Sequence, residues 1–316
     1  MKVAVGISGG VDSAVAASLL LEAGCEVVGV TMALGREHED VSLAAAREVA
    51  DRLGIRLEIM DLAAEWRHRV CDYIRGEYTG GRTPNPCVRC NESVKFGLLP
   101  RLALTTLGCD RFATGHYARH ERGTLLRAAD RTKDQSYFLY RVGPDVLART
   151  LFPLGAMTKV AVREYARGHG LAAAGRGDSQ DFCGGEVGRF VGLEPRAGNI
   201  VTADGRVLGC HLGYWNYTVG KRKGLGIGGG TPYYVVALRP QTNEVVVGFR
   251  EAVVVHGLRL ADTVGRVDFS LPVKVRSAGE PRLLADGVVG AAPGQSAVFY
   301  DGERVVGGGI IEEGLP

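Results

Sequence analysis

The sequence predicts an α/β fold: a doubly wound parallel sheet, followed by a small central β-rich domain and a C-terminal β-barrel. Short apolar runs alternate with helical patterns through the first half of the chain, which favours a parallel sheet with helices on both faces. A glycine-rich turn joins the first run to the first helix. After about Gly198 the helix signals disappear, and short β-type runs alternate with glycine- and asparagine-containing turns, which is typical of small β domains.

The elements of the first half follow one another in a regular strand–helix order. Strands are expected at residues 3–7, 26–30, 55–60 and 111–114, and helices at residues 14–21, 41–53 and 63–73. In a sheet of this kind, ligands bind at the carboxyl ends of the strands. Met32 follows the second strand and Gly115 follows a later one, so both are expected at the ligand-binding edge.

The turn Ser8-Gly9-Gly10-Val11-Asp12-Ser13 is the strongest local signal. A strand, a glycine-rich turn and a helix bring free backbone N–H groups and the positive end of a helix dipole together, which suits a phosphate. The glycines allow close approach of the backbone, and the two serines can add hydroxyl donors. Because a carboxylate repels phosphate, Asp12 indicates either Mg²⁺ or a charge that rests on its own helix N-terminus. An ordinary strand-to-helix turn is the competing interpretation.

Length, composition and charge narrow the class of protein. With 316 residues, 46% of them apolar, the chain can form two or three domains with real cores. No run of about 18 apolar residues indicates a membrane span, and the first residues read as a strand rather than as a signal peptide. The formal net charge is only +3, so a nucleic-acid partner must bind through local basic patches. The odd number of cysteines, seven, favours reduced thiols and a cytoplasmic location.

The segment from Gly81 to Asn91 presents two cysteines between polar residues. Its two prolines predict a constrained loop rather than a helix. Cys87 and Cys90 stand at Cys-x-x-Cys spacing, which is compatible with a redox dithiol, half of a zinc site or ligands of a metal cluster. The next cysteine in a similar polar context is Cys183. The other cysteines lie among apolar or turn residues and are expected to be structural: Cys25, Cys71, Cys109 and Cys210.

The second half of the chain contains one further helix before the β-rich part. This helix is expected from Thr158 to Gly170, with Thr158 as its N-cap and Lys159, Arg163 and Arg167 on its polar side. The basic run Lys221-Arg222-Lys223 lies between glycines and suits phosphate contacts, with a solvated loop as the alternative. We divide the chain into an α/β domain of residues 1–197, a central β-rich domain of residues 198–252 and a C-terminal β-barrel domain of residues 253–316.

The hexapeptide at residues 8–13 resembles the pyrophosphate loop (PP-loop) of the ATP pyrophosphatase superfamily. Further ordered motifs make the chain similar to one family within it, the tRNA-specific 2-thiouridylases. These motifs are residues 83–91, 113–119, 133–138, 178–181, 217–229 and 293–300. The resemblance implies a Rossmann-like sheet of the N-type ATP pyrophosphatase kind in the catalytic first domain, and tRNA binding by the two β domains.

The resemblance also implies how the reaction runs. ATP adenylates the C2 oxygen of wobble uridine 34, so AMP becomes the leaving group and a sulfur nucleophile can attack C2. Cys183 matches the persulfide carrier of the family and Cys90 its partner nucleophile, and a disulfide between them requires Cα atoms within about 7 Å in at least one state. With Mg²⁺, the residues expected to hold ATP are Gly6, Ile7, Ser8, Gly9, Gly10, Val11, Asp12, Ser13, Met32 and Gly115.

Position 87 departs from the pattern of the family, because many members have aspartate where this chain has cysteine. Cys87, Cys90 and Cys183 together can hold a 4Fe-4S cluster with one open iron position for sulfide. The alternative is that Cys87 is a neutral variant beside the catalytic pair. Both interpretations are compatible with the sequence.

The resemblance assigns a further set of residues to tRNA binding, and it implies that the anticodon region of tRNA is the partner. They are Asn85, Pro86, Cys87, His116, Lys133, Asp134, Gln135, Arg276 and Gln295. The family pairs Arg276 with a tyrosine, and this chain has Ser277 instead. For residues 133–135 a solvated turn is the competing interpretation.

The expected function is therefore an ATP-dependent tRNA 2-thiouridylase, a sulfurtransferase that releases AMP and diphosphate. A related sulfurtransferase acting on a small nucleobase or metabolite is the alternative enzyme, and an RNA-binding module with a relic nucleotide site is the non-catalytic alternative. The intact loop and the cysteines argue against the latter. The expected partners are tRNA and a sulfur donor, either a protein or sulfide, without a membrane, and the expected state is a monomer or a weak dimer.

Overall fold

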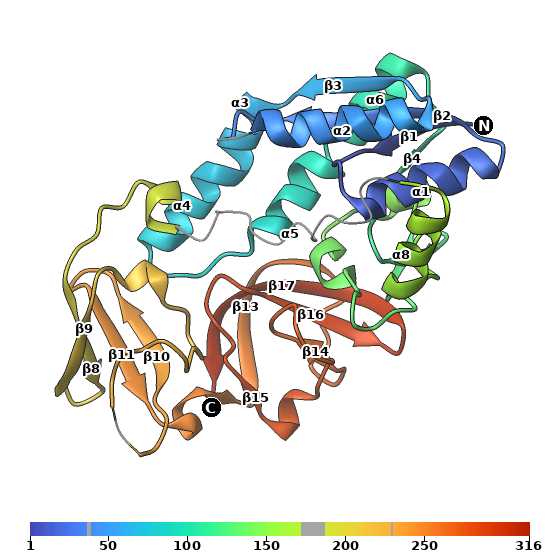
Figure 1. Cartoon of the computed structure of the whole chain (residues 1–316). Helices are drawn as coiled ribbons and strands as arrows, with labels where there is room; N and C mark the ends of the chain where they lie inside the picture. Colours follow the sequence, from blue (N-terminus) through green and yellow to red (C-terminus); the bar gives the residue numbers. More distant parts are fainter. Residues whose placement is uncertain (37–38, 172–186, 229) are drawn as a thin grey trace. The chain divides into compact units, whose positions relative to one another are not determined.

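The computed structural model describes residues 1–36, 39–171, 187–228 and 230–316 (Figure 1). The chain forms two compact units. Unit 1 comprises residues 1–70, 87–180 and 303–305, and unit 2 comprises residues 71–86, 181–302 and 306–316. The chain therefore passes from one unit to the other directly before Cys87, the first cysteine of the Cys-x-x-Cys pair.

Unit 1 contains a five-stranded parallel sheet with the order β3-β2-β1-β4-β7. Its strands are β1 (Lys2–Gly6), β2 (Glu26–Ala33), β3 (Leu57–Asp61), β4 (Arg111–Ala113) and β7 (Thr150–Leu151). Val5 of β1 pairs with Gly29 on one side and with Ala113 on the other. The chain order reverses between β1 and β4, and ligands of α/β sheets bind at such a reversal. The predicted parallel sheet is confirmed.

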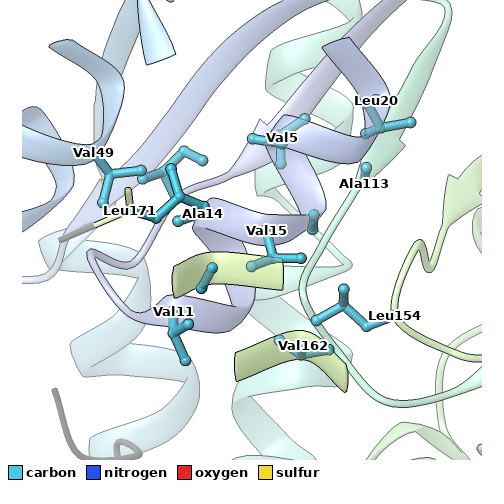
Figure 2. Packing of buried hydrophobic residues seen from close by; sticks show 14 of the residues in the cluster. Val5, Val11, Ala14, Val15, Leu20, Val49, Ala113, Leu154, Val162 and Leu171 are labelled. Carbon is cyan, nitrogen blue, oxygen red and sulfur yellow. The ribbon is translucent and has the colours of Figure 1, made fainter. Parts of the chain in front are cut away.

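Helix α1 connects the first two strands and is buried almost all round. It spans Val11–Glu22, and most of its residues are buried because it packs against the sheet and against α8 (Lys159–Gly168). Figure 2 shows Val15 of α1 and Val162 of α8 in the same apolar cluster as Val5 and Ala113 of the sheet. All four side chains are inaccessible to solvent. This core fixes the start of α1 at the carboxyl ends of β1 and β4.

The remaining helices of the first half include two π-helical turns. Helix α2 (Glu39–Leu53) and helix α6 (Leu99–Leu107) pack against the sheet. The helix predicted at residues 63–73 runs further, as α3 (Ala63–Trp66), a π-turn (Arg67–Cys71) and α4 (Asp72–Thr79). The expectation of a non-helical loop at the cysteines is wrong, because α5 (Pro86–Cys90) is followed by a second π-turn, η2 (Asn91–Lys95). Proline is tolerated in the first turn of a helix, where its missing N–H has no partner to lose.

Between β4 and α8, unit 1 contains short elements. A hairpin of β5 (Arg119–Glu121) and β6 (Thr124–Leu126) precedes the 3₁₀ turn η3 (Ser136–Leu139) and helix α7 (Pro144–Ala148). Leu126 pairs with Arg304, which belongs to the same unit. Met32 lies inside β2 near its carboxyl end rather than after the strand.

Unit 2 is dominated by β structure, as predicted for the second half. Besides α4 and α9 (Val187–Val191), it contains a sheet with the order β10-β11-β8-β9, formed by β8 (Gly198–Thr202), β9 (Val207–His211), β10 (Tyr234–Arg239) and β11 (Glu244–Gly248). The 3₁₀ turns η5 (Tyr214–Asn216) and η6 (Arg250–Val253) flank these strands. The boundaries drawn at residues 197 and 252 stay a prediction.

The C-terminal strands of unit 2 surround their own apolar core. They are β12 (Val254–Val255), β13 (Gly257–Gly265), β14 (Val273–Lys274), β15 (Val288–Val289), β16 (Ser296–Asp301) and β17 (Arg304–Leu315), with the 3₁₀ turn η7 (Leu284–Asp286). Phe299 of β16 and Ile311 of β17 are fully buried in this core. None of the described helices has the length and apolar character needed to cross a membrane.

Candidate functional site

The glycine-rich turn lies at the reversal of strand order. Two positions at this place, one inside the turn and one packed against it, accept only glycine. Gly9 has a left-handed φ of +79°, and a Cβ there would lie 2.5 Å from the Cβ of Ala45 in α2. A Cβ on Gly115 would lie 2.7 Å from the carbonyl carbon of Asp12, in the first turn of α1. Both positions bring backbone closer than any side chain permits. The structure therefore places Gly115, which follows β4, directly against the turn that follows β1.

The two serines of the turn have different roles. The Ser13 hydroxyl donates to the Gly10 carbonyl (3.0 Å) and accepts from the Ser8 N–H (3.2 Å), and Ser13 is buried. Ser8 is exposed, and its hydroxyl lies 3.3 Å from that of Ser13. Ser13 thus braces the loop, whereas Ser8 is the serine whose hydroxyl can reach a ligand. The expectation that both hydroxyls donate to a phosphate stays a prediction.

The carboxylate of Asp12 is neutralised by a lysine from another helix. Lys159 Nζ donates to both carboxylate oxygens, at 2.7 and 2.8 Å, and the Tyr117 hydroxyl donates to one of them at 2.9 Å. The Lys159 side chain is only 8% exposed, and that of Asp12 is 30% exposed. A charge pair of this kind offsets the repulsion that Asp12 would otherwise exert on a phosphate.

The local sequence explains why Lys159 points inward. It is the first residue of α8, where the Thr158 hydroxyl caps the helix by accepting from the Ala161 N–H (3.2 Å), as predicted. Asp130 accepts from the Lys159 backbone N–H at 2.9 Å. This hydrogen bond, together with a larger effect of the Thr132 hydroxyl, lowers the pKa of Asp130. The three residues predicted on the polar side of this helix differ in exposure, because Lys159 is buried whereas Arg163 and Arg167 are exposed.

A divalent metal does not fit these residues as they stand. Asp12 already accepts hydrogen bonds from Lys159 and Tyr117, so a cation could bind it only after Lys159 moved away. Within the ranges that the structure describes, no three His, Cys, Asp or Glu side chains are grouped to hold a metal ion. Mg²⁺ commonly binds substrate phosphates and only one or two carboxylates, so such an ion would depend mainly on the nucleotide.

Helix α5 places the two cysteines one turn apart in different surroundings. Cys90 is buried, whereas Cys87 is exposed. Desolvation raises the pKa of the Cys90 thiol, and the positive charge of Lys95 opposes this shift. The same two effects, in the same order, raise the pKa of the Cys87 thiol. Both cysteines are therefore in the thiol form in the absence of ligands at neutral pH.

The turn after Cys90 is held by charged and polar contacts. One Glu92 oxygen accepts from Arg89 (3.0 Å) and the other pairs with Arg141 (2.8 Å), whose side chain is 6% exposed. The Asn91 amide donates to the Phe138 carbonyl at 3.1 Å. Because both Glu92 oxygens are engaged, this carboxylate does not neutralise Lys95, which forms no ion pair within the described part of the chain. Sequence reasoning did not identify Lys95, Arg141 or Lys159 as site residues, since no local signal marks their partners.

His116 connects the cysteine segment to the loop after β4. Its ring centroid lies 5.4 Å from that of Phe96, which follows η2, and its Nδ1 is hydrogen-bonded to Thr114 Oγ1 at 2.9 Å. Burial, followed by the charge of Lys95, lowers the pKa of His116 well below its ordinary value. The imidazole is therefore neutral at pH 7 and can accept or donate a hydrogen bond without repelling Lys95.

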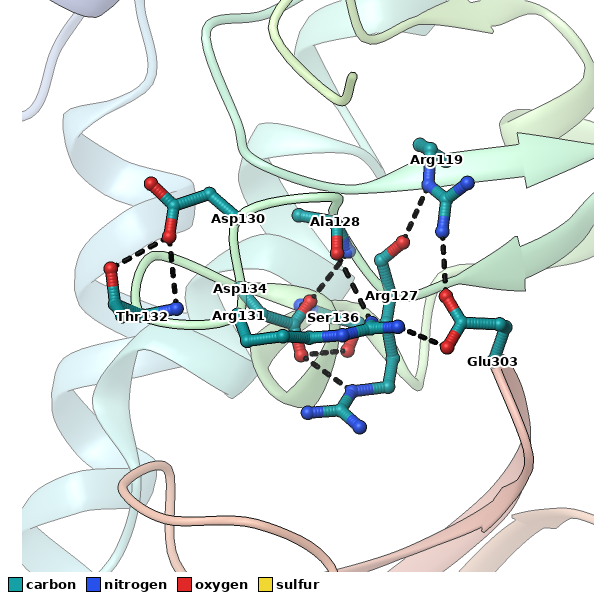
Figure 3. Close-up of polar contacts among 9 residues, drawn as sticks. All are labelled: Arg119, Arg127, Ala128, Asp130, Arg131, Thr132, Asp134, Ser136 and Glu303. Atoms are coloured by element: carbon teal, nitrogen blue, oxygen red, sulfur yellow. Dashed lines mark hydrogen bonds and ion pairs between the residues drawn. The ribbon is translucent and has the colours of Figure 1, made fainter. Parts of the chain in front are cut away.

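Two residues predicted to contact tRNA have structural partners within unit 1. Asp134, with a side chain 1% exposed, accepts from the Ala128 N–H (3.0 Å) and from the Ser136 hydroxyl (2.9 Å) (Figure 3). Gln135 exchanges hydrogen bonds with Tyr117 through its side-chain oxygen and its backbone N–H. For Asp134 the buried carboxylate leaves little surface for a nucleotide. Its predicted tRNA contact, like that of the half-buried Lys133, rests on the resemblance.

Within unit 2, Gln295 holds the segment that leads into α5. Its side-chain amide donates to the carbonyls of Thr83 (2.8 Å) and Pro84 (3.3 Å). A Cβ on Gly294 would lie 2.9 Å from the Thr83 backbone. The predicted tRNA residue Gln295 therefore has an observed role in fixing the chain just before the cysteines. Arg276 is exposed, Asn85 and Pro86 are half-buried, and Cys183 lies outside the described residues.

Comparison with known proteins identifies the family. Three family models match: a tRNA methyl transferase HUP domain at residues 1–184, a tRNA methyl transferase PRC-barrel domain at residues 189–249 and an aminomethyltransferase beta-barrel domain at residues 283–311. The tRNA-specific 2-thiouridylase MnmA of Nostoc punctiforme is 40% identical over 99% of both chains. The protein of the same name from Rhizorhabdus wittichii is 44% identical over 100% of this chain and 92% of its own.

This chain belongs to the tRNA-specific 2-thiouridylase family. The near-complete coverage means that the family likeness extends through both units rather than being confined to the glycine-rich loop. The three matched domains also confirm the predicted fold class, an α/β domain followed by two β domains. The roles of the individual site residues in this 2-thiouridylase family member stay predictions.

Proposed function

We propose that this chain is an ATP-dependent tRNA 2-thiouridylase that replaces the C2 oxygen of wobble uridine 34 with sulfur. One observation carries the proposal: the consecutive residues Gly115 and His116 contact both the glycine-rich loop and the segment that contains the cysteine pair. Gly115 packs against the first turn of α1, and the ring of His116 contacts Phe96 at the end of the cysteine segment. A nucleotide-activating group and sulfur nucleophiles in the same unit are what a thiolation reaction requires.

The loop accounts for the ATP half of this reaction. Backbone N–H groups at the start of α1 and the exposed Ser8 hydroxyl are donors for phosphate oxygens. Lys159 keeps Asp12 neutralised and contributes a positive charge close to the loop. Donors and charge that are fixed before the reaction stabilise the diphosphate that leaves when the uridine oxygen attacks the α-phosphate of ATP. Mg²⁺, when bound, would add charge to the same phosphates.

The cysteine helix accounts for the sulfur half. Once AMP is attached to the C2 oxygen, the terminal sulfur of a cysteine persulfide attacks C2 and AMP leaves with the oxygen. The partner thiolate then attacks the sulfur of the carrier cysteine, which breaks the S–S bond, leaves the outer sulfur on C2 as 2-thiouridine and joins the two cysteines in a disulfide. Cys90 and Cys183 are proposed as the pair that delivers this sulfur, with Cys183 as the persulfide carrier. Of the three thiols suggested for a 4Fe-4S cluster, the described residues include Cys87 and Cys90 only, and no step here depends on a cluster.

The proposal is tested by removing each sulfur in turn. Cys90→Ser and Cys183→Ser should each abolish 2-thiouridine formation on an unmodified tRNA transcript with uridine at position 34, supplied with ATP and a donor of persulfide sulfur. Both should retain ATP binding, because neither residue lies in the glycine-rich loop. Cys109→Ser is the matched control, since Cys109 is another buried cysteine outside the site. Mass spectrometry of the digested nucleosides gives the readout.

The outcomes separate the alternatives considered from the sequence. Full activity of either serine variant would overturn the assignment of the pair. Tight tRNA binding without any 2-thiouridine would favour a relic nucleotide site, whereas thiolation of a free nucleobase alone would favour the small-molecule enzyme. Iron and labile sulfide measured in protein purified without oxygen would decide whether Cys87 serves a cluster.

We also propose the assignments that accompany this function. Residues 1–197 form the catalytic domain, and residues 198–252 and 253–316 form two β domains that bind tRNA. The anticodon region of tRNA and a sulfur donor, either a protein or sulfide, are the partners, and the cytoplasm is the location. For the oligomeric state, a monomer or a weak dimer is proposed.

A further inference from the structure

A stacked pair of aromatic rings, of which Phe249 is exposed and Tyr233 is half-buried, marks one end of the β10–β11 hairpin in unit 2. The rings of Tyr233 and Phe249 are nearly parallel, with an interplanar angle of 18° and centroids 5.0 Å apart. Tyr234 and Gly248 form the last pair of the ladder, so Tyr233 and Phe249 are the next residue on each strand. Phe249 is 48% exposed although Tyr233 covers one of its faces.

Local backbone contacts hold the pair in place. A Cβ on Gly248 would lie 2.9 Å from Val236 Cγ2, so glycine allows β10 to approach closely just before Phe249. Phe249 then precedes the 3₁₀ turn η6, and its carbonyl accepts from the Ala252 N–H at 3.1 Å. The aromatic pair is therefore a built feature of the hairpin end and not the tip of a long loop.

Cations without ion-pair partners in the described ranges stand next to this pair, either in the chain or on the segment bonded to β10. Val235 exchanges backbone hydrogen bonds with Gly220 (2.8 Å) and Lys221 (2.9 Å), which places the basic run that begins at Lys221 alongside the start of β10. Lys221 donates to the Asn216 carbonyl, but Arg222 and Lys223 are exposed and form no ion pair within the described ranges. Arg250, which directly follows Phe249, is also exposed and forms no ion pair within the described ranges. The next residue, Glu251, is exposed and is the acidic residue nearest to Arg250 in the chain.

Stacked rings with unpaired cations around them match one kind of ligand. Unpaired RNA bases stack on aromatic side chains, while lysine and arginine bind the phosphates on either side. An apolar protein partner would gain nothing from this excess of positive charge. We propose that the Tyr233–Phe249 pair is a stacking site for one unpaired base of the tRNA, with Arg222, Lys223 and Arg250 on its flanking phosphates. The choice of tRNA as the RNA rests on the proposed function.

The test measures equilibrium binding of an unmodified tRNA transcript with uridine at position 34 at several salt concentrations. Phe249→Leu keeps apolar bulk but removes the ring, and it should weaken binding about tenfold, as expected for loss of one base stack. Phe269→Leu is the matched control: Phe269 is 49% exposed but packs edge-on against the core residue Phe299 and follows Asp268, so its loss should leave affinity unchanged.

The salt dependence separates stacking from charge. Arg222→Gln and Lys223→Gln should each reduce the slope of log K against log salt by about one, whereas Phe249→Leu should leave that slope as in the wild type. Phe249→Trp keeps an aromatic ring and should bind tRNA with wild-type affinity. A base stacked on the new tryptophan should quench its fluorescence, and this signal can be attributed to position 249 because the two natural tryptophans, Trp66 and Trp215, are buried.

Two results would overturn the proposal. One is wild-type affinity in Phe249→Leu, which would indicate a protein-facing patch instead, and the other is an equal loss in Phe269→Leu, which would indicate a general effect on the unit. All readouts are of binding and need no 2-thiouridine. If the wild type binds tRNA through Phe249 but forms no 2-thiouridine, the stacking site stands and the proposed function fails.

Discussion

The glycine-rich loop and the cysteine helix lie in the same unit but are prepared for their tasks in different ways. The loop is ready before any ligand arrives: Gly9 and Gly115 allow close packing, Ser13 braces it, and Lys159 neutralises Asp12. The cysteine helix is held by contacts of Glu92 with two arginines, and burial raises the pKa of the Cys90 thiol, which keeps it protonated. Under the proposed function, the comparison indicates that the phosphate site would be preorganised, whereas the thiols would need a change in charge or solvation before they could react.

The largest expected effect comes from breaking the ion pair between Asp12 of the loop and the buried Lys159. Lys159→Met leaves the Asp12 carboxylate facing the phosphates without a counter-charge, and ATP binding should be lost. Asp12→Asn leaves the buried ammonium unpaired and should lower the free energy of unfolding by about 3 to 5 kcal/mol. Urea unfolding and ATP titration measure both effects.

A double variant and a control variant at an exposed arginine of α8 complete this experiment. In Asp12→Asn with Lys159→Met no charge is left unpaired, so part of the lost stability should return. Arg167→Met, on the exposed side of the same helix, should change the unfolding free energy by less than about 0.5 kcal/mol. Losses in the two single variants that simply add in the double variant would show that the pair does not act as a unit.

The next largest effect tests whether the loop is held by close packing or only by its backbone conformation. Gly9→Ala combines a left-handed φ with a contact of 2.5 Å to Ala45, whereas Gly24→Ala has a similar φ of +75° and nothing within 4 Å. We expect Gly24→Ala to cost about 1 kcal/mol of unfolding free energy through φ alone. Gly9→Ala should cost more than twice as much and should also weaken ATP binding, as measured by thermal unfolding and titration. Equal losses of unfolding free energy in the two variants would mean that α2 shifts to accommodate the added methyl group at little cost.

The smallest effect concerns the charge at the cysteine helix and leaves stability almost unchanged. Lys95 lowers the pKa values of Cys87 and Cys90 against the effect of burial, so Lys95→Met should move both pKa values upward. Alkylation requires the thiolate, so at a fixed pH just below the pKa the variant should react several-fold more slowly, and its pH profile should shift to higher pH. Iodoacetamide labelling followed by peptide mass spectrometry gives each cysteine its own profile.

Cys109 is the internal control for this experiment. Its raised pKa arises from burial, opposed by Lys2 rather than by Lys95. Its profile should therefore shift in Lys2→Met and stay in place in Lys95→Met, and Lys95→Arg should preserve the profiles of Cys87 and Cys90. Identical profiles for Lys95→Met and the wild type would remove Lys95 from the account of the site.

Local patterns predicted much of the fold because they act over a few residues. The alternating apolar runs gave the strands of the parallel sheet, and Thr158 was identified as an N-cap from its place before a helical pattern. The error at the cysteines has a local cause as well: two prolines suggested a loop, although Pro86 at the first position starts α5. The site was predicted less completely, since Lys159 appeared to be an ordinary member of a polar helix face.

By itself, the sequence determined the family, the glycine-rich turn between a strand and a helix, and the Cys-x-x-Cys spacing of Cys87 and Cys90, because each of these is written in the order of residues along the chain. Only the tertiary structure decided that Lys159 pairs with Asp12 across 147 residues, and that Gln295 holds Thr83 across 212. Such contacts depend on how whole elements pack, and burial decides which charges must find partners. No local pattern contains that information.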